Sequence, residues 1–180
     1  GMVFRFGSAL LSVRAFEQDL VIGEPEYLDA NIVNGFRPDV SFSLGVIERQ
    51  AGFAARLRFE EAPAPLDYWS YLFEPDWEHA AAFVLMRLGA VEKPERRTGW
   101  VIAGGAGVDE AEDRAEAAAA AFARKELKDT LVTSRLGFRR PDLLAYLTLP
   151  TGYTALLHKQ DGRDQPTSVR GPDGRELWGA

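Results

Sequence analysis

The chain has 180 residues, a net charge of −6 and no cysteine. This length suits one domain or two small ones, and the hydrophobic share of 46% is that of an ordinary globular protein, not of a disordered chain or a multispan membrane protein. The absence of cysteine excludes disulfides, thiolate metal sites and a cysteine nucleophile, and two histidines cannot form a three-histidine metal centre. The acidic balance disfavours nucleic acid and anionic membranes as partners.

The N-terminal residues predict no targeting signal. Gly1 before Met2 resembles the remnant of a cleaved tag, so we take the fold to start at Met2. Arg14 and Glu17 interrupt the apolar run that follows, which leaves it too short for a secretory signal, and no segment approaches the roughly 20 apolar residues of a membrane span. We therefore expect a cytoplasmic protein.

The first sixty residues predict antiparallel strands. Leu10–Phe16 is apolar and suited to a strand, and Tyr27–Val33 is a weaker candidate that ends at the turn dipeptide Asn34-Gly35. Apolar and polar residues then alternate over Val40–Arg49 and again over Phe53–Glu60, with a short loop between. This alternation predicts a hairpin with one face toward solvent.

Prolines interrupt the pattern at residues 61–65, which marks a candidate break between two subdomains. Pro75 is placed to open a helix over about residues 75–89, because apolar residues recur there at helical spacing. A strand at Gly99–Ala103 leads through a glycine-rich turn to a second helix over about residues 109–130, which is acidic at its start, mostly basic at its end and rich in alanine.

The C-terminal third predicts shorter elements. Pro141 starts a short helix or a strand, Tyr153–Lys159 is a strand, and Glu176–Trp178 is a last short strand. Strands followed by helices mixed with more strands are typical of an α+β domain. We expect a single domain over residues 2–180, with a mostly antiparallel sheet and the two main helices packed on one of its faces.

The densest chemical feature is a group of aromatic and acidic residues between positions 67 and 78. Its rings suit anchors in a protein interface, and its carboxylates would steer a basic partner toward them. Core packing is the other interpretation of the rings, since aromatic side chains bury large areas. The candidate binding residues are Tyr68, Trp69, Tyr71 and Trp77, together with Asp67, Glu74, Asp76 and Glu78.

A small-molecule pocket between the sheet and the first predicted helix is the alternative, and it would use His79 and Arg97. The glycine-rich turn before residue 108 does not predict a phosphate site, because Val108, Asp109 and Glu110 follow it where a phosphate loop needs lysine and a hydroxyl residue. The sequence contains no nucleophile motif and no calcium-loop spacing, so we predict no catalytic residue, no metal and no cofactor.

These observations favour a non-enzymatic protein-binding module, of the adaptor, regulatory or inhibitor type, over a small-molecule-binding domain or a hydrolase. The expected partner is a protein, for which a basic surface would suit. A homodimer is compatible with either function, because the alanine face of the second predicted helix or an edge strand of the sheet could pair with a second copy.

Overall fold

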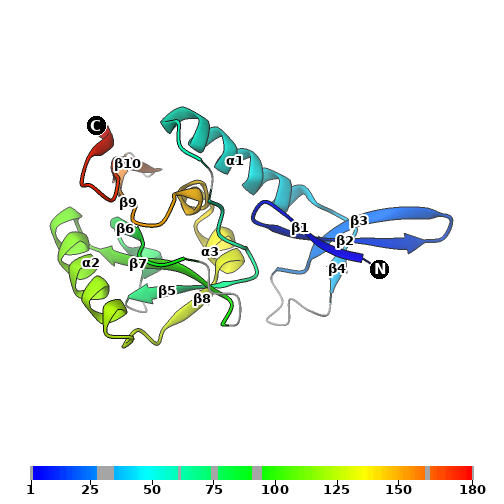
Figure 1. Ribbon diagram of the computed structural model, residues 1–180, viewed down its shortest axis with the longest axis horizontal. Coiled ribbons are helices and arrows are strands. Elements are labelled where there is room, and N and C mark those ends of the chain that lie inside the picture. The colour runs from blue at the N-terminus through cyan, green and yellow to red at the C-terminus, as the bar shows by residue number, and fades with distance from the viewer. Residues whose placement is uncertain are drawn as a thin grey trace.

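The computed structural model describes residues 2–27, 35–60, 62–73, 77–90, 95–160 and 163–179. It contains a four-stranded N-terminal sheet and a seven-stranded sheet with helices packed against it (Figure 1). The predicted α+β class is therefore confirmed. No helix in these ranges is long and apolar enough to cross a membrane.

The N-terminal sheet consists of sequential antiparallel strands and extends away from the rest of the molecule (Figure 1). Its second strand confirms the strand predicted at Leu10–Phe16. The weaker candidate, Tyr27–Val33, lies outside the described residues except for Tyr27, and so does Asn34. The strands are β1 (Met2–Phe6), β2 (Ala9–Phe16), β3 (Asp19–Pro25) and the two-residue β4 (Phe36–Arg37).

Helix α1 (Ser41–Leu57) occupies the region for which the sequence predicted a hairpin, so that prediction is wrong. Two polar residues on its buried face conceal the helical period. The backbone amide of Ser43 donates to Glu24 Oε2 at 2.8 Å, and Gln50 Nε2 donates to the Leu144 carbonyl at 3.2 Å. The buried residues are spaced as in a helix: Ser43, Val46, Gln50, Phe53 and Ala54.

The larger sheet has the strand order β11-β10-β9-β6-β7-β5-β8, and every described pairing is antiparallel except that of β5 with β7. Three of its strands confirm the predictions at Gly99–Ala103, Tyr153–Lys159 and Glu176–Trp178. The strands are β5 (Trp69–Phe73), β6 (Ala82–Arg87), β7 (Arg97–Gly105), β8 (Thr130–Val132), β9 (Thr154–Gln160), β10 (Arg163–Arg170) and β11 (Glu176–Gly179).

The helix predicted at residues 75–89 is wrong. The described part of that segment forms a short 3₁₀ turn, η1 (Trp77–His79), followed by β6. β6 lies between β7 and β9, and all six of its residues are buried, with alternate side chains entering two different cores. A strand covered on both faces is apolar along nearly its whole length, as β6 is before Arg87, and such a run also contains the spacing of an apolar helix face.

Helices cover both faces of the larger sheet, so the expectation that both main helices share one face is also wrong. Helix α2 (Val108–Ala123) confirms the second predicted helix, although it ends before residue 130, and its buried alanines pack against β6 and β7. On the opposite face, α1 packs with α3 (Thr133–Arg139) and the 3₁₀ helix η2 (Pro141–Thr148). The buried alanines of α2 are thus covered by the chain's own sheet and are not free for a second copy.

The proline-rich segment after α1 is hydrogen-bonded on both sides. The amides of Ala62 and Ala64 donate to carbonyls of η2 at 2.9 and 3.0 Å, and the amide of Leu66 donates at 2.9 Å to the carbonyl of Ser8 in the turn between β1 and β2. Arg87 donates to the carbonyls of Ala62 and Leu149, and burial lowers the pKa of Arg87 to about 10. The candidate subdomain break at residues 61–65 stays a prediction.

Candidate binding surfaces

The aromatic residues singled out in the sequence do not form one surface. Trp77 is only 4% exposed and belongs to the core on the α1 side of the larger sheet. Tyr71 packs against the core on the α2 side, so the sheet separates the two rings. Tyr68 is half-buried, and only Trp69, at 40%, is well exposed. Core packing therefore accounts for Trp77, which is not available as a surface anchor.

Asp67 does not face a partner, because two arginines of this chain neutralise it. Its buried carboxylate accepts from Arg5 Nη1 at 2.7 Å and from Arg96 Nη2 at 2.6 Å. Both guanidinium groups also lie near the Tyr68 ring, at 5.2 and 5.6 Å from its centroid. Of the other candidate acids, Glu74, Asp76 and the side chain of Glu78 lie outside the part of the chain that the structure describes.

His79 and Arg97 are far apart, and the helix that was expected to complete their pocket is a strand. η1, which ends at His79, contacts β7, and the amide of Ala81, two residues later, bonds to Gly105 at the end of β7. Arg97 is the first residue of β7. Eight residues of strand separate these ends, which is about 26 Å at 3.3 Å per residue. The predicted pocket is therefore not formed.

The glycine-rich turn before α2 is adapted to close packing. A Cβ atom on Gly105 would lie 2.5 Å from the Ala111 amide nitrogen, so glycine is needed where β7 meets the helix. The Glu110 carboxylate accepts from the Ala106 amide at 2.7 Å and pairs with Arg114 at 2.6 Å. A carboxylate of the chain thus already occupies the position where the start of this helix would hold an anion.

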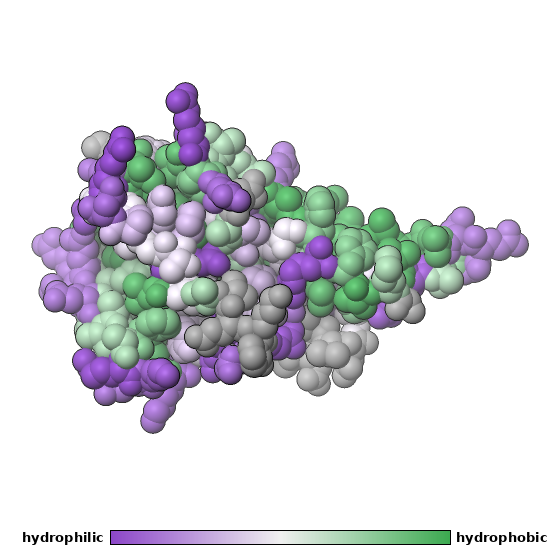
Figure 2. Space-filling view, viewed as in Figure 1, coloured by the Kyte–Doolittle hydropathy of each residue, from purple (hydrophilic) through white to green (hydrophobic). Residues whose placement is uncertain are grey.

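The N-terminal sheet carries most of the exposed apolar side chains. Of the eight large apolar side chains that are exposed in the described residues, six belong to β1, β2 and β3. Figure 2 shows this sheet as a mainly hydrophobic arm with hydrophilic residues at its tip. Continuous exposed apolar surface of this kind is typical of a binding site rather than of ordinary solvent-facing strands.

The strand registers place four of these exposed residues and two half-buried ones, Phe4 and Val13, on one face. Met2 pairs with Val13, and Val13 pairs with Ile22, so the three lie side by side. The other three are two or four positions from them along the same strands and therefore share their face. Leu20 is 75% exposed, Met2 63%, Phe6 55% and Ile22 51%. We call these six residues the apolar face: Met2, Phe4, Phe6, Val13, Leu20 and Ile22.

Toward the body of the molecule the same side of the sheet is covered. Ala9 and Leu11 continue the face and are buried, and α1 contacts β2 there. Glu24, the carboxylate at this end, is fully buried and binds Arg37 and the Ser43 amide. The outer part of the sheet therefore presents only apolar side chains on this face, and no described element covers them.

No protein family, curated protein or solved structure matches the chain.

Proposed function

We propose that the chain is a protein-binding module and that the apolar face of its N-terminal sheet is the contact surface. The exposure of Met2, Phe6, Leu20 and Ile22 supports this proposal most directly. Together these side chains leave roughly 500 Å² of apolar surface in water, within the size range of functional patches on monomers. Burying that surface would release a large hydrophobic free energy.

A second copy of the chain is the occupant that we propose. Two twisted sheets pack face to face about 10 Å apart with interdigitating side chains, and a two-fold axis brings the same patch together from both copies. Such a contact would bury about 1,000 Å² in total, which is at the lower limit for a specific interface. We therefore expect a dimer that dissociates at about micromolar concentrations.

Charge also favours the second copy over a basic partner. The apolar face has no charged side chain in its exposed part, so two copies would meet there without opposing like charges despite the net charge of −6. Steering of a basic protein would need free carboxylates, and Asp67 is already paired with Arg5 and Arg96. A basic partner and a cytoplasmic location remain predictions from the sequence.

Sedimentation equilibrium over a concentration series tests the proposal. The wild-type chain should pass from monomer to dimer, and Ile22→Lys should remain monomeric, because it places a charge within the apolar contact. Gln18→Lys is the control, since Gln18 is exposed in the turn between β2 and β3, outside the apolar face. A wild-type chain that stays monomeric up to about 1 mM would rule out the second copy as occupant. Equal dimerisation of wild type and Ile22→Lys would rule out the apolar face.

A further inference from the structure

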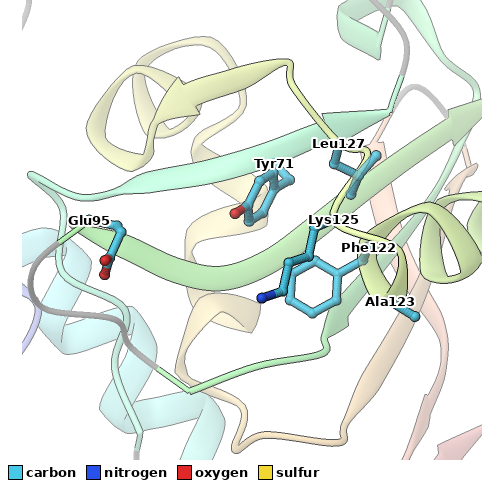
Figure 3. Close-up of a pocket in the computed structure, with 6 residues that line it drawn as sticks. All are labelled: Tyr71, Glu95, Phe122, Ala123, Lys125 and Leu127. Carbon is cyan, nitrogen blue, oxygen red and sulfur yellow. The ribbon is translucent and has the colours of Figure 1, made fainter.

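A cavity of about 450 Å³ lies beside the C-terminal end of α2, over β5 and the approach to β7 (Figure 3). Its volume is in the range of small-molecule pockets. It is separate from the apolar face, and neither His79 nor the predicted helix contributes to it. The lining residues are Tyr71, Glu95, Phe122, Ala123, Lys125 and Leu127.

Two rings form a rigid apolar wall of this cavity. Tyr71 and Phe122 meet edge to face, with ring centroids 5.5 Å apart and an interplanar angle of 85°. Both rings and Leu127 pack against the core between α2 and the larger sheet, which holds them in place. The Tyr71 hydroxyl projects into the open space in Figure 3 and has no hydrogen bond to any described residue.

Lys125 enters the cavity from an unusual backbone position. The amide of Lys125 donates to Phe122 and the amide of Glu126 donates to Ala121, both at 2.9 Å, which is the pair of hydrogen bonds of a Schellman cap. In this motif the residue after the helix is left-handed and usually glycine, and Lys125 has a φ of 59°. The chain therefore carries a lysine where the helix end alone would favour glycine. In Figure 3 the Lys125 side chain runs beside the Phe122 ring, and its nitrogen points toward the side on which Glu95 lies.

The two charged side chains that line the cavity, Glu95 and Lys125, are exposed. Lys125 and Glu95 stand on opposite sides of the space (Figure 3), and neither forms an ion pair with any residue of the described ranges. Arg97 adds a second positive charge behind the wall, with its guanidinium carbon 5.0 Å from the Tyr71 ring centroid. Its Nη1 atom is buried and has no hydrogen-bond partner among the described residues. Among the residues that the structure describes, Lys125 in the lining and Arg97 behind it outnumber the one lining carboxylate, Glu95.

We propose that this cavity binds a small molecule with an apolar, ring-sized body and a single carboxylate. The body would lie against Tyr71, Phe122 and Leu127, and the carboxylate would accept hydrogen bonds from the Lys125 ammonium and the Tyr71 hydroxyl. Glu95 disfavours a second negative charge, which selects a monocarboxylate over a phosphate monoester. This inference does not depend on dimerisation.

Titration of the ¹⁵N-labelled protein with 3-phenylpropanoate and with 3-phenylpropylamine, followed by amide chemical shifts, tests the site, because the two probes share a body and differ in charge. The acid should give saturable shifts around residues 122–127 below about 10 mM and bind at least about tenfold more tightly than the amine. Absence of saturable shifts with the acid, or equal binding of the amine, would overturn the proposal.

Two lysine variants separate the proposed contact from general charge. Lys125→Gly removes the ammonium and suits the left-handed backbone, so the fold should persist and the acid should bind at least about tenfold more weakly. Lys128→Ala removes an exposed lysine that does not line the cavity and should bind as wild type does. Equal affinity of Lys125→Gly and wild type would overturn the role of Lys125.

Discussion

Replacing Asp67 by asparagine should destabilise the protein strongly, although position 67 is one that the sequence suggested for partner binding. The carboxylate is 3% exposed and holds Arg5 in β1 and Arg96 before β7. Asparagine keeps the shape of the side chain but removes its charge and one acceptor oxygen. The substitution therefore weakens two charge-assisted hydrogen bonds that connect the N-terminal sheet with the larger sheet.

The size of the effect follows from the exposure of the partners. Hydrogen bonds to charged groups contribute about 1.5–3 kcal/mol each, and breaking a fully buried ion pair costs about 3–5 kcal/mol. Arg5 and Arg96 are 34% and 42% exposed, so water screens the pairs and can hydrate the arginines after the change. We expect Asp67→Asn to lower the free energy of unfolding by about 2–3 kcal/mol, which corresponds to a fall in Tm of about 4–12 °C.

Urea unfolding followed by tryptophan fluorescence measures this loss, with an unchanged m value showing that the transition is comparable. Asp19→Asn, at an exposed position in the N-terminal sheet, is the matched control and should stay within about 0.5 kcal/mol of wild type. In the double variant Arg5→Met/Asp67→Asn, the two losses should be less than additive, because the two residues share one interaction. A loss of less than about 0.5 kcal/mol in the free energy of unfolding for Asp67→Asn would refute the stabilising role of the ion pairs of Asp67 with Arg5 and Arg96.

Three further substitutions test separate features of the structure. Lys125→Gly should raise the free energy of unfolding by about 1 kcal/mol, because it removes a Cβ atom at positive φ. A lower free energy of unfolding, measured in urea, would contradict the left-handed conformation of Lys125. Burial raises the pKa of Tyr27, so above pH of about 10 the unfolded phenol ionises while the folded one stays protonated, and stability falls as pH rises. Tyr27→Phe should remove part of this loss of stability at alkaline pH. If the free energy of unfolding falls with pH equally in wild type and variant, burial of the Tyr27 hydroxyl does not contribute to the loss. Gly99→Ala should cost more than about 2 kcal/mol, because a Cβ atom there would overlap the Gly89 carbonyl oxygen at a φ of 74°. Gly174→Ala, at a φ of 76° with open space around it, should cost only about 1 kcal/mol, and equal losses at the two glycines would contradict the close approach.

The sequence predicted correctly those elements in which the spacing of apolar residues matches the side that is buried. Helix α2 has acidic residues in its first turn and an alanine face toward the sheet, and both features are visible in the sequence. β2, β7 and β9 are compact apolar runs bounded by turn residues. The prediction was wrong at α1, because buried Ser43 and Gln50 interrupt the apolar face of the helix. It was also wrong at β6, because a strand buried on both faces contains apolar residues at helical spacing.

The binding surfaces depended on contacts that no local pattern contains. Asp67 is paired with Arg5, which lies 62 residues away in sequence, so its burial could not be derived from its neighbours. The apolar face is exposed because no described element covers the outer part of the N-terminal sheet. The spacing of apolar residues in the sequence cannot distinguish a strand that packs on a helix from one that extends beyond it. The cavity depends on the backbone conformation of Lys125 after the helix, for which a lysine in the sequence gives no signal.

Cross-linking through single introduced cysteines tests the central proposal most directly, because the chain has none of its own. Ile22→Cys places a thiol on the apolar face, and Phe16→Cys places one on the opposite face of the same sheet at an even more exposed position, 66% against 51%. With a bis-maleimide that spans about 10 Å, the separation of packed sheets, Ile22→Cys should give covalent dimers at micromolar protein and Phe16→Cys should remain monomeric. Equal yields from the two variants, or no dimer from Ile22→Cys, would contradict a face-to-face contact between two copies.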